Sequence, residues 1–234
     1  MGRLDGKVAL VVGAGSRFGQ VVAVALAREG ALVAAGCGDD ASGSAAVAAV
    51  AAQGGQARHV LLDPTDAGSS AAAVDAALAA YGRIDVLVTR VVSPPRQPRP
   101  FAELGDADWD EALRHVLRGA VLPIRSAFPA LSRQRGSVVV VSSGAGLAGV
   151  PNAAAFSAAT GALVSLTRAL AAEGRAAGVR ANCVCLDASG GTTAADAAPT
   201  IVYLASDESR PVSGQVIALG EDRDQAGVHE VSRA

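Results

Sequence analysis

The chain has 234 residues, of which 20 are basic and 22 are acidic, half are hydrophobic and 18% are charged. This composition is typical of one soluble globular domain, and it excludes a basic nucleic-acid module and a disordered tail protein. The three cysteines have no repeated spacing and no histidine nearby, so they indicate neither a disulfide framework nor a zinc site. We therefore expect buried thiols in a core of small aliphatic side chains.

The first part of the chain alternates between short apolar runs and segments of helical pattern. The runs typical of buried parallel strands are residues 8–12, 31–35, 59–62 and 82–89, and the helical segments between them are 20–28, 45–52 and 71–81. Helices of about 10 to 15 residues between apolar strands indicate βαβ units and a parallel sheet. A proline-rich loop follows at 93–100, which is compatible with neither a helix nor a central strand.

The rest of the chain continues the alternation. Helices are expected at 108–117, 126–132, 154–173 and 200–205, and strands at 138–141, 182–186 and 215–219. The sequence thus predicts one α/β domain over residues 1–234, a Rossmann-like doubly wound parallel sheet with helices on both faces, and a flexible tail at about 221–234. No targeting signal and no apolar run of about 20 residues is present, so we expect a cytoplasmic protein.

A glycine cluster lies between the first strand and the first helix. It runs Gly13-Ala-Gly-Ser-Arg-Phe-Gly19, at the position where the diphosphate of a dinucleotide would meet a helix N-terminus. The spacing does not fit G-x-G-x-x-G. The cluster by itself leaves two interpretations open, a cofactor site and a plain turn from strand to helix.

From Gly6 to Gly220 the chain resembles the short-chain dehydrogenase/reductase family, most closely its acyl-carrier-protein reductase and hydroxysteroid dehydrogenase type. The resemblance is carried by many matches in the family's order. These are residues 6–13, 63–66, 82–88, Trp109, 136–146, 165–171, 204–207 and 212–215. It implies the Rossmann-like fold, a dinucleotide cofactor and oxidation or reduction at a carbon that bears oxygen.

The resemblance also implies where the chemistry would lie. In the family a tyrosine handles the proton, and a lysine four residues later lowers the pKa of that tyrosine; these positions hold Phe156 and Thr160 here. Ser143 matches the family's serine, and Val116 replaces an asparagine that supports a proton relay. Phenylalanine and threonine supply no acid or base near neutral pH, so the resemblance implies a degenerate active site with only Ser143 retained.

The implied cofactor site is partly kept. Gly13 and Gly19 match family glycines, but Arg17 replaces the middle one; it could pair with a phosphate or, as we favour, fill the pocket beside a carboxylate. Asp63 matches a residue that contacts adenine, although an aspartate there is also a common cap. Cys37-Gly38, at the end of the second strand, selects neither NAD nor NADP. We therefore expect no cofactor or weak NAD(P) binding, and no metal.

The surroundings of the implied site also differ from the family. Val92 replaces a glycine near the nicotinamide ribose, and Leu186-Asp187 replaces a Pro-Gly step that lines the nicotinamide pocket. From Asn182 to Ser206 the chain is shorter than is usual, so most of the loop that covers the substrate is expected to be missing.

These observations lead to one main hypothesis and three alternatives. The main hypothesis is a non-catalytic family member, acting as a structural or regulatory subunit of an oligomer with an active paralogue, through the fourth and fifth helices and the C-terminal helix and strand. The first alternative is an enzyme with a non-redox reaction, such as cyclisation, isomerisation or dehydration, in a pocket beside Ser143, Thr160, Arg90 and Asp187. The others are a residual NAD(P)-dependent oxidoreductase on a hydroxyacyl, ketoacyl or steroid-like substrate, and a nucleotide sensor without turnover.

Overall fold

The computed structural model describes residues 2–90, 98–188 and 191–220 of the chain. Its centre is a seven-stranded sheet in the order β3-β2-β1-β4-β5-β6-β7, and every pair of neighbouring strands is parallel. The strands are β1 (Val8–Val12), β2 (Leu32–Cys37), β3 (Gln56–Leu61), β4 (Val86–Thr89), β5 (Ser137–Ser143), β6 (Arg180–Leu186) and β7 (Val216–Leu219). This confirms the predicted Rossmann-like sheet.

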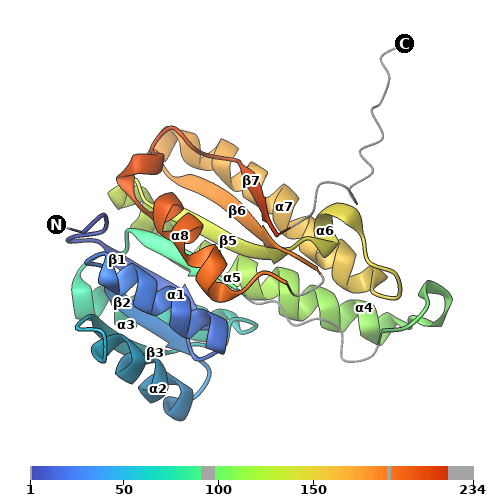
Figure 1. Cartoon of the computed structure of the whole chain (residues 1–234), viewed down its shortest axis with the longest axis horizontal. Coiled ribbons are helices and arrows are strands. Elements are labelled where there is room, and N and C mark those ends of the chain that lie inside the picture. Colours follow the sequence, from blue (N-terminus) through green and yellow to red (C-terminus); the bar gives the residue numbers. More distant parts are fainter. Residues whose placement is uncertain (1, 91–97, 189–190, 221–234) are drawn as a thin grey trace.

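Helices cover both faces of the sheet (Figure 1). One face packs against α1 (Arg17–Arg28), α2 (Asp40–Ala51) and α8 (Ala194–Ala205), and the other against α3 (Ala67–Tyr81), α5 (Gly119–Gln134) and α7 (Ala154–Gly174). Two shorter helices, α4 (Asp106–Ala112) and α6 (Ala145–Ala148), are the remaining α-helices of the described residues. Burial on both faces explains why the central strands β1, β4, β5 and β6 are largely apolar and fully buried, whereas the edge strand β3, with Arg58 and His59, is partly exposed.

Two helical regions are longer than the sequence predicts. α4 continues through a π-helical segment, Leu113–Arg118, into α5, although Pro123 and Pro129 lie inside α5. α8 begins at Ala194, because Thr193 and Asp196 form a capping box ahead of Pro199. A proline inside a helix removes one backbone donor, and tertiary packing compensates for that loss here.

α7 is the longest helix, and it lies within the core. With the turn after it, Ala154–Ala177 is long and apolar enough to cross a membrane by length and composition alone. Its buried residues, among them Phe156 and Leu163, belong to the apolar cluster beneath the sheet. α7 thus packs against the sheet as part of the folded core.

The amino ends of β1 and β4 are joined by a buried carboxylate. Asp85, 3% exposed, accepts hydrogen bonds from the backbone N–H of Val8 at 2.9 Å and from the guanidinium of Arg83 at 2.6 and 2.9 Å. The backbone of Asp85 also bonds Val8 and Ser137. One side chain therefore ties together the strands on both sides of the point where the strand order reverses.

We expect Asp85→Ala to lower the free energy of unfolding by about 1 to 3 kcal/mol, because the buried N–H of Val8 loses its acceptor. Urea denaturation followed by circular dichroism measures this. Glu208→Ala is the matched control, since its ion pair with Arg3 is partly exposed and such pairs contribute about 1 kcal/mol or less. Equal losses in the two variants would contradict the assigned role of Asp85.

Candidate functional site

The carboxyl ends of the central strands meet at one edge of the sheet. The pairings of Val12 with Thr89 and of Ser143 with Leu186 place the residues after β1, β4, β5 and β6 side by side along this edge. The strand order reverses between β1 and β4, because the chain passes outward to β2 and β3 before it returns to β4. In open α/β sheets, ligands bind in the crevice outside such a switch point.

The turn after β1 is closed around its glycines. Gly13 has a φ of +76°, a conformation that favours glycine, and a Cβ on Gly19 would lie 2.1 Å from the carbonyl oxygen of Gly13. Ser16 caps α1: its Oγ accepts from the N–H of Gly19 at 3.0 Å and donates to the carbonyl of Gly13 at 2.8 Å. The two glycines therefore let the start of α1 lie directly against the end of β1.

Arg17 is the first residue of α1, and its side chain is exposed. Among the described residues it forms neither an ion pair nor a side-chain hydrogen bond. The favoured expectation, that Arg17 fills the pocket beside a carboxylate, is therefore wrong. The guanidinium stands instead at a helix N-terminus, where backbone N–H groups and the helix dipole also favour an anion.

A second cation, Arg90, lies directly after β4. The sequence predicts it in the pocket of the non-redox alternative and does not assign it to the cofactor site. Its guanidinium carbon stands 4.4 Å from the centre of the ring of Phe18, the second residue of α1. Its Nε and the Oγ1 of Thr89 are buried without a hydrogen-bond partner among the described residues. Burial lowers the pKa of Arg90, but a guanidinium stays protonated.

The residues that the resemblance matched to the family's proton-transfer positions are buried together beside β5. Phe156 is 8% exposed within the apolar core cluster, and Thr160 is fully buried. The Oγ1 of Thr160 donates to the carbonyl of Phe156 at 2.8 Å, within its own helix. Val116, in the π-helical segment, is buried as well. These three side chains therefore contact protein and present no titratable group.

Ser143 is the polar side chain that ends β5. It is 8% exposed, and its Oγ accepts a hydrogen bond from the N–H of Ala145 at 3.2 Å. A serine hydroxyl has one proton to donate in addition to its acceptor lone pairs. The bond from Ala145 therefore orients the oxygen and leaves that proton available at the carboxyl edge.

The other predicted cofactor residues lie at the ends of β2 and β3. Asp63 is exposed, and hydrogen bonds from the backbone N–H and the hydroxyl of Thr65 lower the pKa of its carboxyl. Cys37 is buried, and burial raises the pKa of its thiol. After it, Asp39 caps α2 by accepting from the N–H and the hydroxyl of Ser42. These contacts hold the two aspartates in place as turn and cap residues.

Between β6 and α8 the chain is short, as predicted. Leu186 ends β6 and α8 begins at Ala194, while the hydroxyl of Thr192 donates to the carbonyl of Leu219 at 2.9 Å. This bond ties the connection to the end of β7. Val92, expected near the cofactor ribose, lies outside the described residues, as do positions 93–97 of the proline-rich loop.

Known proteins resemble this chain over most of its length. The profile of the short chain dehydrogenases matches residues 7–199. The 3beta-hydroxysteroid dehydrogenase of Mediterraneibacter gnavus is 29% identical, covering 93% of this chain and 95% of that protein. The 3-oxoacyl-[acyl-carrier-protein] reductase of Thermotoga maritima is 30% identical, covering 93% and 97%. A solved short-chain dehydrogenase/reductase from Burkholderia xenovorans superposes with a TM-score of 0.86 at 32% identity, covering 93% and 96%.

These relatives overturn the main hypothesis on function. The prediction of a non-catalytic subunit is wrong, because the similar proteins are named for the oxidation or reduction that they catalyse, and they match nearly the whole chain. The alternative of an oxidoreductase fits better. The predicted surfaces for a partner, on the fourth and fifth helices and at the C-terminal helix and strand, stay predictions. The chain belongs to the short-chain dehydrogenase/reductase family, whose members are typically soluble and bind NAD(P).

Proposed function

We propose that this protein is a cytoplasmic NAD(P)-dependent oxidoreductase that reduces a ketone on an acyl chain or a steroid-like skeleton. The observation that carries the proposal is the pair of side chains at the carboxyl edge of the sheet beside the switch point, where Arg90 is half-buried without an anionic partner among the described residues and Ser143 holds an available hydroxyl proton. The substrate class follows the names of the two relatives, a hydroxysteroid dehydrogenase and an oxoacyl reductase.

The residues of the crevice fit the diphosphate of a dinucleotide. Gly13 and Gly19 allow the backbone of the turn to pack closely, because a Cβ on Gly19 would collide with the carbonyl oxygen of Gly13 and one on Gly13 would lie 3.0 Å from the carbonyl oxygen of Arg90. Arg17 and Arg90 supply two cations without a carboxylate partner in the described part of the chain, and they match the two negative charges of a diphosphate. In this proposal, charge-assisted hydrogen bonds from arginine to the diphosphate contribute to cofactor binding in place of the close backbone approach that the family's middle glycine allows.

When bound, the nicotinamide supplies a hydride to the carbonyl carbon. Ser143 donates its hydroxyl proton in a hydrogen bond to the carbonyl oxygen and stabilises the negative charge that develops there. The bond from the Ala145 N–H to the Oγ of Ser143 favours this donation by withdrawing electron density from the oxygen. In this proposal, solvent water supplies the final proton.

The proposal includes a slow rate. Phe156 and Thr160 stand where the resemblance to the family places a tyrosine and a lysine, and neither side chain donates or accepts a proton near neutral pH. Because forward and reverse reactions share one transition state, the lack of this acid/base pair slows alcohol oxidation and ketone reduction alike. We therefore infer a rate below that of family members that carry the full acid/base pair, with the direction set by the concentrations of cofactor and substrate.

Binding of the cofactor is the first test. We expect saturable binding of NADH or NADPH in calorimetric titration, and Arg90→Gln weakens it by about 10- to 100-fold, because hydrogen bonds to a charged group contribute about 1.5 to 3 kcal/mol. Arg118→Gln, a substitution of an exposed arginine on the segment before α5, leaves the Kd unchanged. Absence of saturable binding of both cofactors to the unmodified protein would overturn the proposed function.

The role of Ser143 is tested by turnover. With a β-ketoacyl thioester and a 3-ketosteroid as substrates, Ser143→Ala lowers kcat by about 10²- to 10³-fold, as for loss of one donor at a developing oxyanion. Ser165→Ala, on the exposed side of α7, serves as the control and keeps kcat. Unchanged kcat in Ser143→Ala would exclude the proposed role. Conversion of substrate without any cofactor would instead support a non-redox reaction.

Restoring the acid/base pair tests why the reaction is slow. The double substitution Phe156→Tyr with Thr160→Lys raises kcat by about 10²- to 10⁴-fold, the usual contribution of general acid–base catalysis. Thr160→Lys alone brings a cation without a proton donor and gives no such gain. Thermal unfolding identifies variants that fail to fold, in which case Phe156→Tyr alone is measured. A folded double variant with the original kcat would contradict this account.

A further inference from the structure

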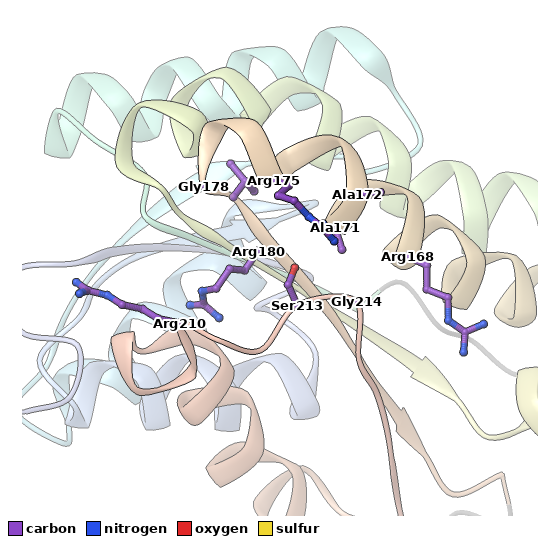
Figure 2. A pocket seen from close by; sticks show the side chains of 10 residues that line it. Arg168, Ala171, Ala172, Arg175, Gly178, Arg180, Arg210, Ser213 and Gly214 are labelled. Carbon is purple, nitrogen blue, oxygen red and sulfur yellow. The ribbon is translucent and has the colours of Figure 1, made fainter.

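A pocket lies at the edge of the sheet opposite the switch point. Its volume is about 320 Å³, and it is formed by the C-terminal end of α7, the start of β6 and the loop before β7 (Figure 2). Because all strands are parallel, the start of β6 and the chain before β7 stand at the amino edge of the sheet, opposite Ser143 at the carboxyl end of β5. The pocket is therefore separate from the proposed cofactor site.

The charge of this pocket is of one sign. Its ten lining residues include four arginines and no aspartate or glutamate; the arginines are Arg168, Arg175, Arg180 and Arg210. Arg210 forms an ion pair with Asp207 at 3.0 Å, outside the lining. Arg168 and Arg175 are exposed, and neither takes part in an ion pair among the described residues. Uncompensated cations around one concavity favour an anion.

The innermost arginine is fixed by the fold. Arg180 is 8% exposed, and it donates to the carbonyls of Leu204 and Ser206 at 3.0 Å and to the hydroxyl of Ser209 at 2.7 Å. Two of these bonds go to backbone carbonyls at the C-terminal end of α8, and together the three bonds use three of the five N–H groups of the guanidinium. Arg180 is thus a cation held in one orientation at the base of the pocket.

The other lining groups suit a small molecule with an apolar part. Ser213 accepts a hydrogen bond from the N–H of Ala181 at 3.3 Å, and its hydroxyl points toward the end of α7 (Figure 2). Ala171 and Val179 give an apolar wall. A Cβ on Gly214 would lie 3.4 Å from that of Ala171, so the absence of a side chain at Gly214 keeps this wall open.

The spacing of the two exposed arginines indicates the kind of anion. Arg168 and Arg175 are seven residues apart, which places them about two helical turns apart on nearly the same face of the chain at the end of α7. Figure 2 shows them on the helix side of the pocket, with Arg180 and Arg210 on the other side. Several guanidinium groups around one space match the multiple oxygens and charges of phosphate better than a single carboxylate.

We propose that this pocket binds a small organic phosphate, at a site distinct from the cofactor crevice. Arg168 and Arg175 supply the mobile charge contacts, and Arg180 and Ser213 supply the fixed donors. The C-terminal end of α7 carries a partial negative charge of the helix dipole, which one nearby cation is enough to balance. The pocket has four arginines, so positive charge remains for a ligand.

Inorganic pyrophosphate at constant ionic strength is the probe, and calorimetry is the measurement. The background is Arg17→Gln with Arg90→Gln, which removes the two cations of the carboxyl edge. In this background we expect saturable binding at one site, weakened tenfold or more by adding Arg168→Gln with Arg175→Gln. The control is Arg114→Gln with Arg118→Gln in the same background. This pair removes the same two positive charges and leaves the Kd unchanged, because neither residue lines the pocket.

Arg180 is left unchanged, because its loss would release the end of α8 and confuse folding with binding. Absence of saturable pyrophosphate binding in the background variant would overturn the proposal. Equal weakening by the two pairs of substitutions would do the same, since it would show attraction by net charge alone. Neither result depends on whether NADH or NADPH binds at the carboxyl edge, so the two proposals fail separately.

Discussion

Burial of the parallel strands on both faces restricts where this chain can place polar chemistry. Every residue of β5 and β6 is buried, so a polar side chain within them needs a partner inside the protein. Asn182 satisfies this need by bonding the backbone on both sides of the loop before β7. Side chains with capacity to bind a ligand are therefore found where strands end, with Ser143 and Arg90 at the carboxyl edge and Arg180 at the amino edge.

The proposed reaction follows from what stands at the carboxyl edge. Arginine and serine donate hydrogen bonds, and neither removes a proton from an alcohol near neutral pH. Hydrogen-bond donors at this edge can bind the phosphates of the cofactor and stabilise an oxyanion. Hydride transfer to a ketone requires both of these interactions. In the proposed function, the carboxyl edge therefore serves binding and oxyanion stabilisation, while solvent replaces the missing acid/base pair at the positions of Phe156 and Thr160.

Apolar runs predicted the central strands well because burial on both faces imposes one rule on them, whereas the partly exposed edge strand β3 begins at Gln56, before the predicted run 59–62. The run 8–12 coincides with β1, and the expected strand 182–186 lies within β6. The helical boundaries were less predictable where proline occurs, since the capping box of Thr193 with Asp196 outweighs the local effect of Pro199 in α8. Spacing also could not reveal that Arg17 points to solvent or that Arg90 lies over Phe18, because those contacts join separate elements.

The same limit applies to the amino-edge pocket, whose walls come from segments 30 or more residues apart in the chain. Arg180 there serves the fold first, because the last carbonyls of α8 have no partner within the helix. The carbonyl of Leu204 also accepts from the hydroxyl of Ser137 at 2.8 Å, and the carbonyl of Ser206 accepts from the hydroxyl of Ser209 at 3.0 Å, so Arg180 adds to bonds that already satisfy both groups. Because three N–H groups of Arg180 are engaged in these contacts, a ligand must share Arg180 and gain most of its affinity from Arg168 and Arg175, whose charges no described contact uses.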